Sequence, residues 1–158
     1  MRNAQDLQRY IDEQGIDAEL LLLEEDTPTV EAAAQVVGCQ PEQIGKSVMF
    51  LINGEPNMVV ASGLTRICYK KLAAHFEVSR RRIKLAKADE VLEIGGFPVG
   101  TVPPFGHKTA LPTLIEANTL KQDELFVGGG AINALVRITS EELQKTLQTQ
   151  VIDLAKDE

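Results

Sequence analysis

Two hydrophobic periods alternate along the chain, one typical of helices and one typical of strands. Apolar positions three and four residues apart predict helices over residues 3–14, 30–37, 65–76 and 88–95, and a last helix from Ser140. Short apolar runs predict strands at residues 18–23, 47–52, 58–62, 81–86, 110–117, 124–127 and 133–138. Because strands and helices are interspersed without strict βαβ alternation, the pattern favours one α+β domain over residues 1–158, built on a mixed sheet.

Local residue signals set the ends of several predicted elements. Thr29 can cap the second helix, and Gly38 ends it. Thr139 and Glu142 have the spacing of a capping box at the start of the last helix. The segment NGEPN, residues 53–57, joins two strands into a predicted hairpin.

The composition is typical of a folded protein of the cytoplasm. Hydrophobic residues make up 44% of the 158 positions, which is enough for a core without disulfides. Cys39 and Cys68 lack the spacing of a disulfide scaffold, so reduced thiols are expected. No signal-peptide core is present, and no apolar run approaches the roughly 20 residues that span a bilayer. The sequence therefore predicts a cytoplasmic protein that does not bind membranes.

Charge is distributed unevenly along the chain. The net charge is -7, which argues against a general nucleic-acid binder, and the 4% aromatic content argues against base stacking along a strand. Residues 66–87 nevertheless hold eight of the 16 basic residues, with Glu77 as the single acid. This segment is either a patch for an anionic partner or an ordinary solvated surface, and charge alone does not choose between them.

Two glycine-containing segments imitate phosphate-binding motifs. Gly45-Lys46-Ser47 resembles the end of a P-loop, but Gln40 stands where that motif needs glycine, and a strand follows instead of a helix. The segment GGGAIN, residues 128–133, lacks the spacing of a dinucleotide fingerprint and reads as a turn. We therefore reject nucleotide hydrolysis, and from the residues alone Lys46 is an ordinary surface lysine.

The segment GGFPVGTVPPFGHK, residues 95–108, carries the strongest local signal. Its glycines allow backbone to approach a ligand closely, while its prolines stiffen the loop. Long loops without secondary structure in small domains are more often functional than structural. Such a loop suits a preorganised site whose N–H groups face an oxyanion.

No side-chain nucleophile or metal site can be assembled from the sequence. His75 falls on the apolar stripe of the 65–76 helix and is expected in the core, whereas His107 ends the glycine-proline loop and is the better site candidate. Neither a GxSxG motif nor a zinc-binding cluster is present. A hydrolase built on this chain is expected to work without metal, cofactor or covalent intermediate.

Three motifs in this order resemble the YbaK and prolyl-tRNA-synthetase (INS-like) editing-domain family. They are Lys46 in GKSVMFLI, the GxxxP loop from Gly100 to Pro104, and the glycine turn in FVGGG. The similarity covers about residues 3–153. The resemblance implies a partly barrel-like, mostly antiparallel sheet with flanking helices, and a free-standing aminoacyl-tRNA deacylase.

The resemblance also implies residue roles. The catalytic set would be Lys46, Gly100, Thr101, Val102 and Pro104, with loop N–H groups at the developing charge and water attacking with help from the substrate's ribose hydroxyl. Substrate-binding residues would be Pro103, Phe105, Gly106, His107, Gly128, Gly129 and Gly130. Acceptor-stem contacts would be Arg66, Lys70, Lys71, Arg80, Arg81 and Arg82.

This sequence departs from the branch of the family that removes cysteine from proline tRNA. That branch continues its glycine turn with Lys-Arg-Gly, whereas this chain has Ala131-Ile132-Asn133, and Thr101 and Pro103 stand where glycine and serine are common. Alanine is therefore as good a candidate substrate as cysteine. The expected partners are the acceptor end of an aminoacyl-tRNA and a prolyl-tRNA synthetase, with the protein a monomer or weak homodimer.

Two other functions stay open on the sequence. One is a non-catalytic module that binds a tRNA end, a nucleotide or a protein in the same pocket. The other is hydrolysis of a different small ester, because a Gly/Pro oxyanion cradle serves that chemistry too.

Overall fold

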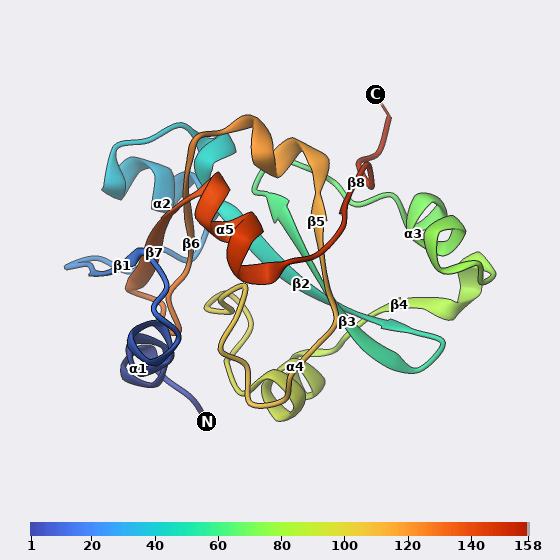
Figure 1. Cartoon of the computed structure of the whole chain (residues 1–158), viewed down its shortest axis with the longest axis horizontal. Coiled ribbons are helices and arrows are strands. Elements are labelled where there is room, and N and C mark those ends of the chain that lie inside the picture. Colours follow the sequence, from blue (N-terminus) through green and yellow to red (C-terminus); the bar gives the residue numbers. More distant parts are fainter. Residues whose placement is uncertain (158) are drawn as a thin grey trace.

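Two β-sheets organise residues 1–157, which the computed structural model describes (Figure 1). The strands are β1 (Ala18–Leu22), β2 (Gly45–Ile52), β3 (Glu55–Ser62), β4 (Ile83–Leu85), β5 (Thr113–Glu116), β6 (Glu124–Gly128), β7 (Ala134–Thr139) and β8 (Val151–Ile152). The α-helices are α1 (Ala4–Gln14), α2 (Val30–Val37), α3 (Tyr69–Phe76), α4 (Ala88–Gly95) and α5 (Ser140–Leu147). Short 3-10 helices are η1 (Pro41–Gln43), η2 (Arg80–Arg82) and η3 (Ala117–Lys121).

The strands form a three-stranded sheet in the order β1-β7-β6 and a five-stranded sheet in the order β4-β2-β3-β5-β8. The β3–β5 and β5–β8 pairs are parallel and the other pairs are antiparallel, so the predicted mixed, mostly antiparallel α+β fold is confirmed. An isolated bridge between Ile44 and Phe126 joins the two sheets. The strands of residues 1–157 do not close into a barrel, which corrects the partly barrel-like expectation.

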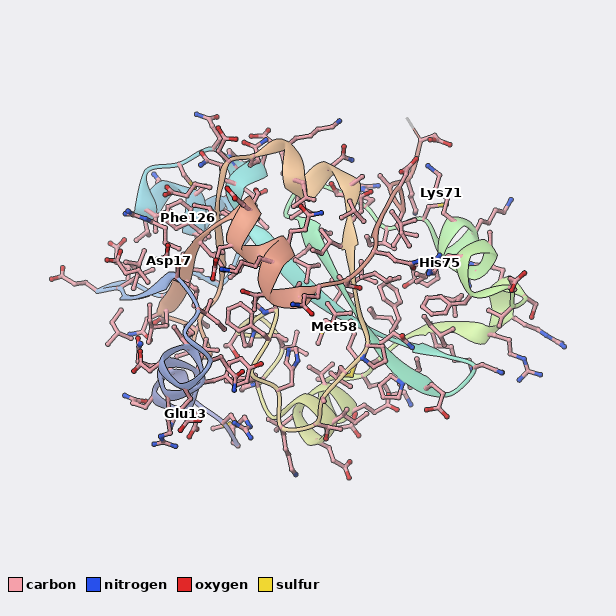
Figure 2. The ribbon with its side chains drawn as sticks, viewed as in Figure 1. Glu13, Asp17, Met58, Lys71, His75 and Phe126 are labelled. Atoms are coloured by element: carbon pink, nitrogen blue, oxygen red, sulfur yellow. The ribbon has the colours of Figure 1, made fainter. Side chains whose placement is uncertain are left out.

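Both faces of the five-stranded sheet are buried, as the alternation of side chains along β3 shows. Met58 and Val60 pack into one core with α1, α4 and α5, and Val59 and Ala61 pack into a second core with α3. Figure 2 shows Met58 in the interior between the elements, with α3 and its labelled Lys71 and His75 on the opposite side of the molecule from Phe126.

The hairpin is tighter than predicted. Asn53 and Gly54 alone form the turn, with φ of 53° and 84°, which matches a two-residue hairpin turn. Strand β3 therefore starts at Glu55 and includes Pro56. Pro56 fits because it occupies a non-hydrogen-bonded pair with Leu51 and lies before Met58, where β5 begins to pair.

Helix α3 begins at Tyr69 and not at Thr65 as predicted. Residues just before it are drawn into contact with the C-terminal segment: Ile67 bridges Ala155, and the Cys68 N–H donates to the Leu154 carbonyl at 2.6 Å. Leu64, placed on the apolar stripe by its spacing, is 52% exposed. His75 is half-buried, edge-on to Phe76, and not in the core.

The other predicted elements differ mainly at their ends. Helix α2 with its Thr29 cap and helix α4 have their predicted bounds. The predicted strands 81–86 and 110–117 shorten to β4 and β5, with η2 taking up residues 81–82 and η3 taking up residue 117. Thr139 caps α5, but the Glu142 carboxylate accepts from the Asp17 N–H at 2.9 Å, so the second half of the capping box is absent. None of the helices in residues 1–157 has the length and apolar character needed to cross a membrane.

Candidate active site

A cavity of about 350 Å3 is lined by residues from strands of both sheets. Its walls come from β2, the start of α2, the start of α4 and the 95–108 loop. Lys46, Gly100, Val102 and Gly128 all line it, so all three sequence motifs contribute to one cavity. The deeper lining is apolar and includes Met49, Met58 and Val91.

Among the described residues that line the cavity, Lys46 is the only one with a charged side chain. Its Nζ donates to the Thr65 carbonyl at 2.6 Å and to the Gly63 carbonyl at 3.4 Å, and these two bonds fix the position of the ammonium. Partial burial lowers the pKa of Lys46 below its ordinary value, and the positive charge of Arg66 lowers it further. An anion bound beside Lys46 and Arg66 would relieve the repulsion between the two cations.

The Gly100–Val102 segment offers main-chain donors. The Thr101 N–H donates to the Pro98 carbonyl at 3.1 Å, and its hydroxyl donates to the same carbonyl at 2.7 Å, so Thr101 closes a turn. Within residues 1–157, the N–H groups of Gly100 and Val102 have no hydrogen-bond acceptor. Gly100 has a φ of +89°, which favours glycine there. Gly100 and Val102 therefore offer main-chain donors without acceptors among the residues that line the cavity.

The glycine turn holds this segment in place. A Cβ added to Gly128 would lie 2.6 Å from the Val102 carbonyl carbon and 2.9 Å from the Thr101 oxygen, which only glycine avoids. The Gly130 N–H donates to the Thr101 carbonyl at 2.9 Å. Gly128 lines the cavity, whereas Gly129 and Gly130 are buried behind it. The turn thus supports the loop, and of the three glycines predicted to bind substrate only Gly128 lines the cavity.

Comparison with known proteins identifies the family. Residues 24–146 match the family model described as the aminoacyl-tRNA editing domain. The chain belongs to the aminoacyl-tRNA editing domain family. The resemblance drawn from the three sequence motifs is therefore confirmed.

Individual relatives agree with this assignment. The chain is 30% identical over 136 residues to the uncharacterised protein YwhH of Bacillus subtilis (strain 168), covering 85% of each chain. It is 28% identical over 102 residues to the proline–tRNA ligase of Thermotoga neapolitana, covering 65% of this chain and 17% of that enzyme. A solved structure described as a proposed trans-editing enzyme for prolyl-tRNA synthetase is 32% identical, with a TM-score of 0.90 over 98% of this chain and 97% of that one.

The second half of the editing domain's loop lies away from the cavity. Pro104, Phe105, Gly106 and His107 line a separate groove on the α1 and α5 side, and Phe105 stacks on Tyr10 with ring centroids 5.9 Å apart. Pro103 is buried, and its carbonyl accepts from the His107 Nε2–H at 2.7 Å. The predicted substrate contacts of residues 103–107 are thus not brought to the cavity that holds Lys46.

Burial of His107 is expected to make the stability of the protein depend on pH. Burial lowers the pKa of His107 below its ordinary value of 6.5, the Pro103 carbonyl opposes this, and Arg2 reinforces it. Below about pH 6.5 the unfolded chain therefore binds a proton that the folded chain resists, so stability falls as pH falls. Urea unfolding of the parent and of His107→Gln between about pH 5 and about pH 8 should show the parent losing stability relative to the variant on acidification. A difference that stays constant across this range would contradict the assignment.

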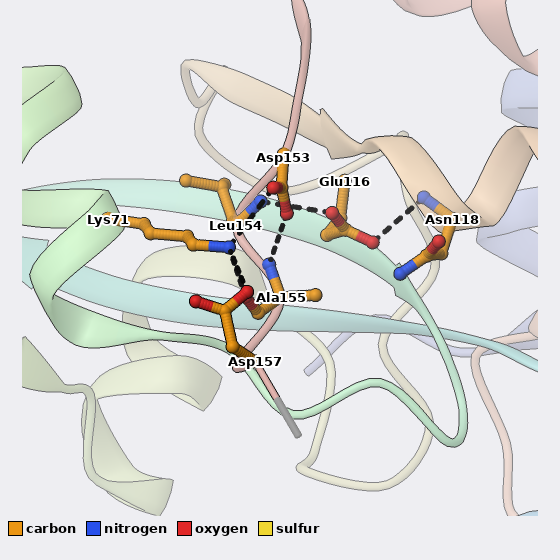
Figure 3. Close-up of polar contacts among 7 residues, drawn as sticks. All are labelled: Lys71, Glu116, Asn118, Asp153, Leu154, Ala155 and Asp157. Carbon is orange, nitrogen blue, oxygen red and sulfur yellow. Dashed lines mark hydrogen bonds and ion pairs between the residues drawn. The ribbon is translucent and has the colours of Figure 1, made fainter.

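The predicted acceptor-stem residues occupy different surroundings. Lys71 binds Asp153 at 3.0 Å, Asp157 at 3.2 Å and the Ala155 carbonyl at 2.7 Å, so the C-terminal segment already engages it (Figure 3). Arg80 lies over the Tyr69 ring at 4.3 Å. Arg80 is exposed, and so are the other four, which are Arg66, Lys70, Arg81 and Arg82. Arg66 is the one that lowers the pKa of Lys46. Their contact with tRNA stays a prediction.

Sequence reasoning missed several residues of the cavity. Thr27 and Val30 line it from the start of α2, and the Thr27 N–H donates to the Ile132 carbonyl at 2.8 Å. Asn133 contacts the chain just before Thr27, because the Asn133 carbonyl accepts from the Leu23 N–H at 2.7 Å. The unusual 131–133 turn therefore braces a cavity wall. Ser47 was missed as well, although its place after Lys46 in an apolar strand was a usable signal.

Proposed function

We propose that this editing domain, acting as one unit over residues 1–158, is a hydrolase that removes a mischarged amino acid from transfer RNA. The observation that carries the proposal is the cavity in which Lys46, the acceptor-free N–H groups of Gly100 and Val102, and an apolar interior come together. A cation suits the terminal phosphate or ribose, the N–H groups suit the ester carbonyl, and the apolar interior suits a small side chain.

The proposed reaction is attack of water on the ester carbonyl. The carbonyl oxygen gains negative charge, which the Gly100 and Val102 N–H groups stabilise. The bond between the acyl carbon and the ribose oxygen then breaks, and that oxygen takes a proton. The products are the free amino acid and tRNA with both terminal hydroxyls. The neighbouring ribose hydroxyl of the substrate assists the water. This hydroxyl takes the part of a general base, because no histidine or carboxylate is among the described residues that line the cavity.

The proposed substrates are small amino acids, such as alanine or cysteine, on proline tRNA. The relationship to a proline–tRNA ligase and to a proposed trans-editing enzyme for prolyl-tRNA synthetase supports this choice of tRNA. Small apolar side chains are also those that a synthetase discriminates by only about 10- to 200-fold per methylene, so a separate editing step is useful.

A multiple-turnover assay tests the proposal. Mischarged proline tRNA in large excess over the protein, with EDTA present, should lose its amino acid at a rate proportional to protein concentration. Saturable binding of the charged tRNA without any turnover would instead favour a non-catalytic binding module. Activity abolished by EDTA and restored by a divalent metal would contradict the metal-independent mechanism.

A further inference from the structure

Strand β2 has an unpaired edge where it borders the cavity. Strand β4 pairs with β2 only from Phe50 to Ile52, and the Ala86 N–H donates to the Met49 carbonyl at 3.0 Å as the next contact on that side. Main-chain groups of a strand alternate sides with a period of two, so the N–H and C=O of Ser47 face the same side as those of Met49. No strand of residues 1–157 continues the pairing to Ser47, and the next link on that side is the bridge at Ile44.

The Ser47 side chain is also without a partner. Its Oγ is buried, and it is the one buried side-chain polar atom in residues 1–157 that lacks a hydrogen bond. Ser47 lines the cavity between Lys46 and Met49. Leaving a buried hydroxyl unpaired is costly, so a strand that keeps one beside a cavity indicates a ligand that completes the bonding.

The cavity offers an aminoacyl ester hydrogen-bond acceptors but no carboxylate side chain. The ester carries an α-amino group that donates two or three N–H bonds, and sites for such groups commonly use a carboxylate. No Asp or Glu is among the described residues that line this cavity, and its charged residue is the cation Lys46. The Ser47 Oγ is an acceptor without a partner, the Ser47 carbonyl faces the strand edge that β4 leaves open, and Gly100 and Val102 line the same cavity.

We propose that Ser47 is the specificity-determining residue that binds the α-amino group of the aminoacyl ester, through its edge carbonyl and its hydroxyl. This assignment rests on the proposed deacylase function. With the amino group at β2 and the ester carbonyl at Gly100 and Val102, the amino-acid side chain lies toward Met49 and Met58. A prolyl group presents a ring nitrogen with one N–H fewer, so this arrangement also disfavours the cognate amino acid.

A substitution cycle with stable substrate mimics tests the assignment. The probes are 3′-alanylamino-3′-deoxyadenosine and 3′-propionylamino-3′-deoxyadenosine, which differ only in the α-amino group and cannot be hydrolysed as esters. Calorimetric titration of the parent should give the alanyl probe about 10-fold tighter binding than the propionyl probe, the ratio expected for a hydrogen bond to a charged group. In Ser47→Ala, which keeps the main-chain carbonyl, the ratio should fall about fivefold.

The matched control is Ser79→Ala, because Ser79 is exposed, lacks a side-chain capping bond and lies outside the cavity lining. It should keep the parental ratio. Ser47→Ala removes an unpaired hydroxyl, so its unfolding midpoint should equal or exceed that of the parent.

Two results would overturn the assignment of Ser47: equal binding of both probes to the parent, or a ratio that is unchanged in Ser47→Ala, including the case in which both probes lose affinity equally. These results are distinct from failure of the proposed function. A parent that prefers the alanyl probe through Ser47 but hydrolyses no charged tRNA would refute the deacylase and leave amino-group binding established.

Discussion

Replacing Gly128 with alanine is expected to cost about 3 kcal/mol of folding free energy and to lower deacylation on the order of 100-fold. The added methyl group would lie 2.6 Å from the Val102 carbonyl carbon, and this neighbour is backbone that cannot rotate away. The Gly100–Val102 segment must therefore shift, and the N–H groups at the cavity shift with it. Urea unfolding and initial deacylation rates measure the two effects.

Gly38→Ala is the control for losing a glycine. Gly38 has a φ of +75°, but a Cβ there meets nothing within 4 Å, so only the conformational cost of about 1 kcal/mol is expected and activity should be kept. If Gly128→Ala is as stable and active as Gly38→Ala, the glycine turn does not hold the loop in the way described.

Lys46→Met is expected to reduce deacylation kcat/KM on the order of 10- to 100-fold, mainly through KM. Methionine keeps most of the apolar stem but removes the ammonium, which we propose binds the terminal phosphate or ribose. The hydrogen bonds to the Gly63 and Thr65 carbonyls are lost as well, so the folded state should be checked by its unfolding midpoint.

Lys84→Met provides the comparison for Lys46→Met. Lys84 is an exposed lysine on the neighbouring strand β4 and does not line the cavity. Its removal changes the net charge equally, so Lys84→Met should show only the loss of kcat/KM that comes from one positive charge fewer on the protein. Equal effects of the two variants would remove Lys46 from the site.

Periodicity predicted most of the fold because most elements bury a stripe of their own. Helices α2 and α4 have their predicted bounds, and for α2 the Thr29 cap and Gly38 marked both ends in the sequence. The start of α3 was wrong because Ile67 and Cys68 contact Ala155 and Leu154, residues far along the chain that no local pattern reveals. Strand β8, which makes part of the same contact region, has only two residues and no periodic signal.

Part of the site was also predictable from the sequence. The resemblance identified Lys46, the Gly100 loop and the glycine turn, and the fold brings all three to one cavity. The sequence interpretation assigned the whole 95–108 loop to one site. In the structure Thr101 closes a turn within the loop, and residues 104–107 line another groove. The role of Ser47 depends on where β4 stops pairing with β2, which is a property of strand register and not of the local sequence.

The central claim is that this editing domain hydrolyses a mischarged aminoacyl-tRNA and spares the correct one. The most direct measurement charges one proline tRNA separately with alanine, cysteine, serine and proline, and follows the loss of each amino acid with and without the purified protein. The account predicts rapid loss of a small non-cognate amino acid, with prolyl-tRNA decaying at the rate seen without protein. Protein-independent decay of all four, or hydrolysis of prolyl-tRNA as fast as the others, would contradict it.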